Sequence, residues 1–260
     1  MAYPTFDDFS LNSDNYILSE IVYRTIPERA TDTQRVARRP GVKLLAHDFG
    51  QRTIRMSGHI IGSSASDLRA KIDDLHTNIT RKNEGTLIIE ADRSARATVT
   101  SVGVADPHYA QDMVPFDIEF LLPDPFFYGD SQTVSWAMTD STSVEKSITI
   151  SGSVFAVPSI VYQSPNVDPD PTAVKAISVT YQPTAETVTW SGSTGDGFLA
   201  KGASVTFDYN HHLISTGSTN VTTSGVFSRW EPGSTDLTVT FNGTPTTGGT
   251  LSFTYQPRYL

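Results

Sequence analysis

The segment that most constrains the fold is a strand that ends at two closely spaced prolines. In residues 116–122, apolar side chains alternate with Asp117 and Glu119, which buries one face of a strand and leaves the other in water. Pro123-Asp124-Pro125 then prevents further ladder pairing, because proline lacks an amide hydrogen. The aromatic run at 126–128 follows at once and predicts that this exit segment packs against a domain.

The composition changes after Tyr128, which indicates a domain boundary. Residues 129–260 hold only 5 Lys/Arg and 10 Asp/Glu, and they are dense in Ser, Thr, Val and aromatic residues, as in exposed β-strands. A chain of 260 residues can hold two ordinary domains, each with its own core. We therefore expect one domain at 1–130 and a second at 131–260.

Composition excludes several classes of protein. The absence of cysteine excludes disulfide scaffolds, thiolate metal sites and cysteine nucleophiles. A net charge of −9 argues against sequence-independent binding to nucleic acid. The first twenty residues carry four acidic side chains and no apolar run, and no segment has the length of a membrane span. We expect a soluble protein made in a cytoplasm.

The first half predicts a sheet with one helix and a basic excursion. Strands are expected at 17–26 and 52–61, where Ile54, Met56 and Ile60 alternate with polar residues. The segment between them, about 27–48, reads either as a long solvated loop or as a protruding arm that reaches a neighbouring subunit. The basic residues of this arm, together the candidates for a subunit interface, are Arg29, Arg35, Arg38, Arg39 and Lys43.

The helix is predicted from its start signal and its apolar stripe. Ser64 precedes Asp67 by three residues, so its hydroxyl can accept a hydrogen bond from the Asp67 amide. Apolar residues at 68, 72, 75 and 79 share one face, and Gly85 is expected to end the helix in a left-handed conformation. Strands at 86–91, 95–104 and 114–122 complete the domain, with a turn at Asp92-Arg93 between the first two.

The second half reads as strands only. After a polar segment at 129–145 that we expect to be irregular, strands are predicted at 147–150, 160–162, 177–181, 187–190, 204–209, 237–241 and 251–255. Turn residues separate them, as in a β-sandwich of jelly-roll or lectin-like type. The predicted fold class is thus mainly β, and residues 147–260 are expected to fold alone.

The sequence offers little for catalysis, metal binding or a cofactor. Asp117 and Glu119 share a strand face, as a glycosidase pair might, but alternating charge on a wet face explains them better. Adjacent His211 and His212 point to opposite faces of a strand and lack a third ligand. We therefore predict no enzyme, no metal and no cofactor, and a glycan hydrolase is retained only as the least favoured hypothesis.

Sugar binding by the second half is a hypothesis with a structural alternative. Trp190, Tyr209, His211 and Trp230 could stack on and bind a hexose. The alternative, which we favour, is that both tryptophans fill the core of the sandwich.

The order of these features resembles that of siphophage distal tail proteins. The strand 53–62, the helix that follows it, the segment 86–89 and the exit Phe120–Tyr128 correspond to the first domain of that family. In the second half, 190–192, 205–209, 227–234 and the terminal 255–259 fall where the family pattern would have them. The resemblance spans almost the whole chain, and its motifs are structural.

The resemblance implies a virion protein at the tip of a long non-contractile tail. Such proteins form a hexameric ring through the first domain, which stacks on the tail-tube protein. The ring links the tail tube to fibre proteins or to a tail-tip hub protein of a lysin-like kind. A galectin-like sandwich projects outward and is expected to hold receptor-binding or other baseplate proteins. The alternative is a carbohydrate-binding module fused to a small α+β domain, which would be a monomer or dimer that binds host glycan.

Overall fold

The structure is a computed structural model that describes residues 4–35, 42–81, 83–105, 112–139, 141–166, 174–192, 199–221, 224–243 and 248–260, with backbone only at 30–35 and 42–48. The chain divides into two compact units, Met1–Tyr128 with Tyr259–Leu260, and Gly129–Arg258. The chain passes from the first unit to the second between Tyr128 and Gly129, two residues before the boundary expected from the sequence. The return of the last two residues to the first unit was not foreseen.

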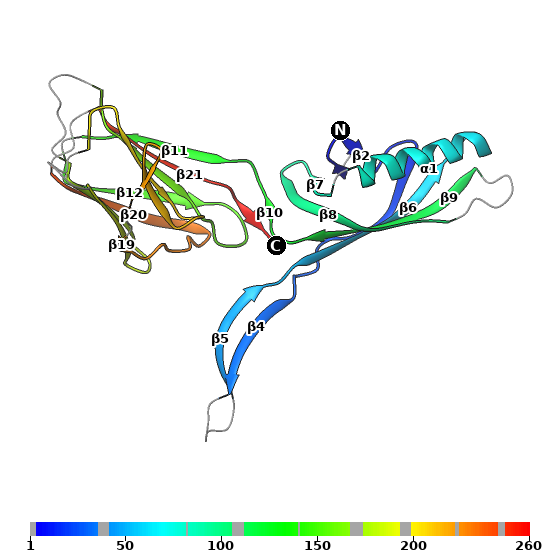
Figure 1. The fold of residues 1–260 in the computed structure, drawn as a ribbon, viewed down its shortest axis with the longest axis horizontal. Helices are drawn as coiled ribbons and strands as arrows, with labels where there is room; N and C mark the ends of the chain where they lie inside the picture. Colours follow the sequence, from blue (N-terminus) through cyan, green and yellow to red (C-terminus); the bar gives the residue numbers. More distant parts are fainter. Residues whose placement is uncertain are drawn as a thin grey trace. The chain divides into compact units, whose positions relative to one another are not determined.

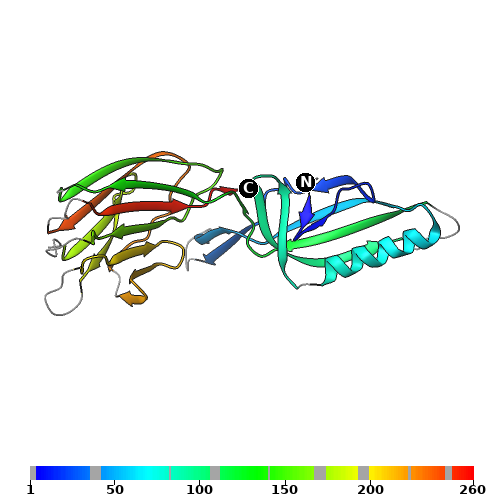
Figure 2. The same cartoon turned by 90° about the horizontal axis from the view of Figure 1, so that it is seen from above.

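The first unit is built on one antiparallel sheet (Figures 1 and 2). Its main path runs β2-β1-β7-β8-β9-β6-β3, and β10 pairs with β8 through Tyr128 and Ser94. The strands of this sheet are β1 Thr5–Phe6, β2 Phe9–Ser10, β3 Tyr16–Val22, β6 Arg52–Ile61, β7 Gly85–Glu90, β8 Arg93–Val104, β9 Met113–Leu122, β10 Phe127–Tyr128 and β22 Arg258–Tyr259.

The alternation seen in the sequence sets the two faces of this sheet. In β6, Ile54, Met56 and Ile60 are buried, and in β9 the buried residues pair with them across the ladder, Phe120 opposite Ile54 and Ile118 opposite Met56. The odd-numbered residues of both strands point to the other face. The strands predicted at 52–61, 86–91, 95–104 and 114–122 are confirmed, although the turn after β7 lies at Ala91-Asp92, one residue earlier than expected. The strand predicted at 17–26 is shorter and ends at Val22.

Helix α1, Ala65–Thr80, covers the apolar face (Figure 2). Its predicted N-cap is confirmed, because the Ser64 hydroxyl accepts a hydrogen bond of 3.2 Å from the Asp67 amide. Leu68, Leu75 and Ile79 are buried and pack into the same core as the inner face of the sheet.

The predicted role of Gly85 is wrong. The helix ends at Thr80 and its C-cap, Arg81, is right-handed, so Gly85 is the first residue of β7 instead. Glycine is needed there for space, since a Cβ atom would lie 2.6 Å from the Phe6 ring.

The basic segment forms a hairpin, one of the two forms that its sequence allowed. Strand β4, Arg29–Arg35, pairs with β5, Val42–Phe49, and a register shift lies between Asp32 and Thr33. Within the described residues these strands pair only with each other, and in Figure 1 they lead away from the main sheet of this unit.

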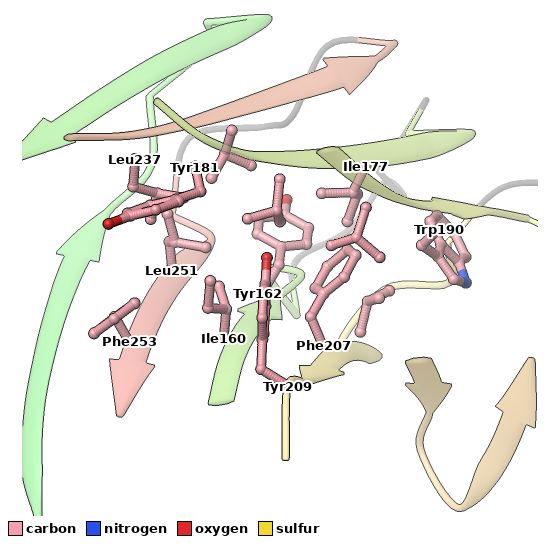
Figure 3. Packing of buried hydrophobic residues seen from close by; sticks show 14 of the residues in the cluster. Ile160, Tyr162, Ile177, Tyr181, Trp190, Phe207, Tyr209, Leu237, Leu251 and Phe253 are labelled. Atoms are coloured by element: carbon pink, nitrogen blue, oxygen red, sulfur yellow. The ribbon is translucent and has the colours of Figure 1, made fainter. Parts of the chain in front are cut away.

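The second unit is a sandwich of two antiparallel sheets, ordered β11-β21-β13-β16-β17-β18 and β12-β20-β14-β15-β19. Side chains from both sheets meet in one core, where those labelled in Figure 3 point toward one another. The strands are β11 Gln132–Ala137, β12 Ser143–Ile150, β13 Ser159–Gln163, β14 Ala176–Tyr181, β15 Glu186–Ser191, β16 Ser204–Asp208, β17 Leu213–Thr216, β18 Thr219–Val221, β19 Ser224–Gly225, β20 Gly233–Asn242 and β21 Thr250–Tyr255. The mainly β fold class, with one packed helix and a sandwich, is confirmed.

The expectation of an irregular segment at 129–145 is wrong. It contains β11 and the first residues of β12, each at the end of its sheet. Most residues of β11 are exposed, so no buried alternation marks it in the sequence. A fragment that starts at Ser147 lacks β11 and half of β12, and the self-contained unit is therefore Gly129–Arg258.

Candidate functional site

One sheet face of the first unit is a candidate surface for binding another protein. The outward side chains of β3, β6, β9 and β8 form it, on the side of the sheet opposite the core; we call it the open face. It includes a shallow depression of about 330 Å³. The residues that line this depression are Glu20, Val22, Arg55, Met56, Ser57, Ser101, Asp117, Ile118 and Glu119.

Charges on the open face are partly paired. Arg55 donates from Nε to Glu119 Oε2 at 2.8 Å, and Thr100 donates to the Glu119 backbone oxygen at 3.1 Å. Asp117 and Glu20 add further negative charge. Asp117 packs close to Gly103, where a Cβ atom would lie 2.4 Å from Oδ1. The charges that line the depression are therefore mainly acidic, and its cation, Arg55, is held in an ion pair.

The arrangement of Asp117 and Glu119 does not suit acid–base catalysis. Asp117 is exposed, and Glu119 is paired with Arg55 at the surface. A general acid at neutral pH needs a carboxyl group shielded from water, and neither side chain is shielded. The open face is suited to contact with another surface.

Strand β3 is the edge of this sheet and carries exposed apolar side chains. Ile17 is 45% exposed and Val22 43% exposed, and both point to the open face opposite His59 and Arg55. Among the described strands, β6 is the only one that pairs with β3. An edge with unpaired backbone groups and exposed apolar residues is a template for pairing with another chain.

The sequence carries a signal for this edge. The predicted strand at 17–26 has apolar residues on both faces, at Ile17 and Leu18 and again at Ile21 and Val22. Only Leu18 and Ile21 pack against the core, which leaves the other two outside.

The basic residues proposed for the arm are spread along the hairpin. Arg29 lies at its root, where the guanidinium carbon is 5.2 Å from the centre of the Phe49 ring. Arg35 and Lys43 lie near its far end, at adjacent positions of the β4–β5 ladder. Arg38 and Arg39 fall outside the described residues.

The aromatic residues proposed for sugar binding lie in the core of the sandwich. Trp190, Tyr209 and Trp230 are 3%, 2% and 0% exposed, and the Tyr209 ring packs edge-on against Trp230. Burial raises the pKa of Tyr209 above its usual range. These rings have no exposed face on which a sugar could stack. They are core residues, as the favoured alternative predicted for the two tryptophans.

His211 differs from the other three candidates because it is exposed. Its Nδ1 atom lies 2.7 Å from Asp208 Oδ2, and the backbone amides of Asn210 and His211 donate to Oδ1 of the same carboxylate. Burial opposes ionisation of Asp208, but the hydrogen bonds from His211 outweigh it and hold the pKa of the carboxyl below its usual value. The cluster orders a turn, and within the described residues no three His, Asp or Glu side chains are grouped to hold a metal.

Comparison with known proteins identifies the class of the first unit. Residues 5–122 match the family model described as phage tail protein RIFT-related domain. No curated protein sequence matches the chain. The described part of the chain has no helix long and apolar enough to span a membrane.

Solved structures extend the comparison to the second unit. The Dit protein of phage SPP1, described as a paradigm of the hub adsorption apparatus in phages that infect Gram-positive bacteria, has the same fold at 14% identity, with a TM-score of 0.68. The similarity covers 99% of this chain and 98% of that one. Two structures of the phage P2 baseplate in its activated conformation, with calcium or strontium, are similar at 9% identity. These similarities cover 95% and 93% of this chain and 91% of each baseplate chain, with TM-scores of 0.43 and 0.41.

The resemblance to siphophage distal tail proteins is confirmed by the family match and the shared fold. The first unit carries a phage tail protein RIFT-related domain, and the chain is a structural component of a siphophage tail and so of the virion.

Proposed function

We propose that the protein forms a hexameric ring at the distal end of the tail. In this proposal the first unit builds the ring and joins the tail-tube protein to the tail-tip hub protein. The second unit holds receptor-binding or fibre proteins. The observation that carries the proposal is the fold shared with the Dit protein of phage SPP1 along almost the whole of both chains.

The surfaces of the first unit support the ring. A ring needs two different patches on each subunit, one for each neighbour, because its contacts run head to tail. The β3 edge with Ile17 and Val22 is one candidate patch, and the hairpin with Arg29, Arg35 and Lys43 is another. Basic residues on the hairpin would complement the acidic open face of a neighbour.

Such a hub acts by assembly and needs no active site, cofactor or metal. Its function depends on repeated subunit interfaces, which set the number of subunits in the ring, and on surfaces where partner proteins dock. The second unit has the sandwich form on which partner proteins can dock, and host glycan is a further candidate ligand for it.

Light scattering behind a sizing column tests the ring directly. Six copies of the 28.3 kDa chain weigh about 170 kDa, and negative-stain images of that peak should show a central channel. A monomer that persists at high concentration and on tail tubes, and that binds glycans, would contradict the hub and support a carbohydrate-binding module.

Substitution of the edge strand tests which surface assembles. The double variant Ile17→Lys with Val22→Lys should remove the ring, because two charges would be buried at the new interface without partners. Val134→Lys is the matched control, since Val134 is 41% exposed on an edge strand of the other unit. Rings that persist in the double variant would exclude the β3 edge from the interface.

Deletion of the arm tests the second patch. Removal of residues 31–48 should leave both units folded and lower the oligomeric state. Complete rings formed without these residues would show that the hairpin is not needed for assembly.

A further inference from the structure

A buried arginine lies at the root of the β4–β5 hairpin. Arg52, the first residue of β6, is 2% exposed, although arginine is rarely buried without a paired charge. Its Nε, Nη1 and Nη2 atoms are all buried, and none has a hydrogen-bond partner within the described residues. Burial lowers the pKa of the guanidinium.

The contact recorded for this guanidinium is with an aromatic ring. The guanidinium carbon lies 5.0 Å from the centre of the Phe127 ring, a cation–π distance. Phe127 is 1% exposed and also packs edge-on against Tyr23, with ring centres 6.2 Å apart. It belongs to residues 123–128, the exit segment, through which the chain leaves the first unit.

The neighbouring residue of the exit segment holds the other side of the hairpin root. The Phe126 ring packs edge-on against Phe49, the last residue of β5, with centres 5.6 Å apart. Gly50 follows, and its amide donates to the Glu28 backbone oxygen at 2.7 Å, so both strands of the hairpin are joined at this point.

Two successive rings of the exit segment thus contact the two sides of the hairpin root. Phe126 contacts Phe49, the last residue of β5, and Phe127 contacts Arg52, the first residue of β6. The β4–β5 hairpin cannot change direction at its root without shifting Phe126 or Phe127. A displacement of the exit segment must likewise break one of these contacts. Coupling of this kind is reciprocal, because it is one free energy shared by two segments.

We propose that the hairpin root is a conformational coupling device, in which Phe49–Phe126 and Arg52–Phe127 make the hairpin and the exit segment move together. Arg52 sets how easily the device opens. A buried cation without a carboxylate destabilises the packed state, and an apolar residue of similar size would remove that cost. The packed root is therefore held closed less firmly than an apolar root would be. A force on the exit segment then releases the hairpin, and a partner that displaces the hairpin loosens the exit segment.

Hydrogen exchange measured by mass spectrometry on the full chain tests the coupling. Phe126→Ala should speed amide exchange in the hairpin, residues 29–49, about five- to tenfold, and Phe49→Ala should speed exchange at residues 126–128 by a similar factor. Phe9→Ala is the matched control, because Phe9 makes a similar edge-on contact, with Tyr16, elsewhere in the same sheet. It should leave both segments unchanged.

The arginine is tested separately with Arg52→Met, which keeps a long apolar stem and removes the charge. This variant should slow exchange in both the hairpin and the exit segment. Faster exchange in Arg52→Met would overturn the role given to Arg52. Faster exchange confined to the mutated segment in either folded phenylalanine variant would overturn the coupling. Phe126→Ala and Phe49→Ala remove the same ring contact from opposite sides. If one of them fails to fold, the other is sufficient to test the coupling.

Discussion

Replacement of Trp230 by alanine should strongly destabilise the second unit, and it should remove no side chain from the protein surface. Trp230 is one of two tryptophans in this core and is fully buried. Its ring centre lies 4.6 Å from that of Tyr181 in one sheet and 5.1 Å from that of Phe253 in the other, so it joins the two halves of the sandwich. Truncation would leave a cavity between the sheets.

The magnitude follows from this burial. Buried aromatic residues cost about 3–5 kcal/mol when cut to alanine, from lost apolar contact and the cavity that remains. No hydrogen bond is lost in addition, because the indole nitrogen of Trp230 has no partner within the described residues. A domain has about 5–15 kcal/mol of total stability, so the loss should be a large part of it.

Tryptophan fluorescence during urea unfolding measures this loss selectively. The 3 tryptophans of the chain, Trp136, Trp190 and Trp230, all lie in the second unit, and two reporters remain in the variant. With a urea dependence of about 1.5–2 kcal/mol per molar, the midpoint should fall by about 2–3 M. Trp136→Ala is the control, since Trp136 is only partly buried against the same core and should cost much less.

The reasoning is refuted if Trp230→Ala shifts the midpoint no more than Trp136→Ala does. The ring would then be loosely packed and accessible, and sugar stacking on Trp230 would again be open. If the native protein binds glycans, a Trp230→Ala variant that unfolds easily but still binds them would show that Trp230 serves the core and not sugar binding.

The remaining predictions concern the first unit. Ser64→Ala should destabilise the start of α1 by about 1 kcal/mol, seen as faster amide exchange in its first turn, whereas exposed Ser66→Ala should have little effect. Gly58→Ala should cost about 1–3 kcal/mol in thermal unfolding, because the new Cβ would lie 2.3 Å from the Ile17 carbonyl oxygen; unchanged stability would mean that β3 shifts freely. The Ser63 backbone amide, then Lys71, lowers the pKa of Asp67 to about 2, so its support of the helix start is complete above the ordinary carboxyl pKa and is lost as pH falls toward 2. A carboxyl titration by NMR with an ordinary midpoint would contradict this, and Asp67→Asn should remove that pH dependence.

Elements with strong local patterns were predicted closely. Strand β6 has the predicted bounds, because Ile54, Met56 and Ile60 are buried and the odd-numbered residues between them face outward. The start of α1 was also correct, since capping by Ser64 depends on residues only three positions apart. Elements without such patterns were missed. Strand β11 lies at the edge of the sandwich with most side chains exposed, and Gly85 serves the space next to Phe6 rather than a helix end.

Composition and local periodicity alone determined the class of this protein: a cysteine-free, mainly β chain with one capped helix and a change of domain after Tyr128. Burial of individual residues was decided only by tertiary packing. Trp230 and His211 were both named as candidates for a sugar site, with the core favoured for Trp230, and the structure has Trp230 in the core and His211 exposed. Arg52 looked like any charged residue at the start of a strand, and only the packing of Phe127 against it made it a buried cation. Local pattern reports which face of an element is apolar, whereas the partners that cover that face come from distant parts of the chain.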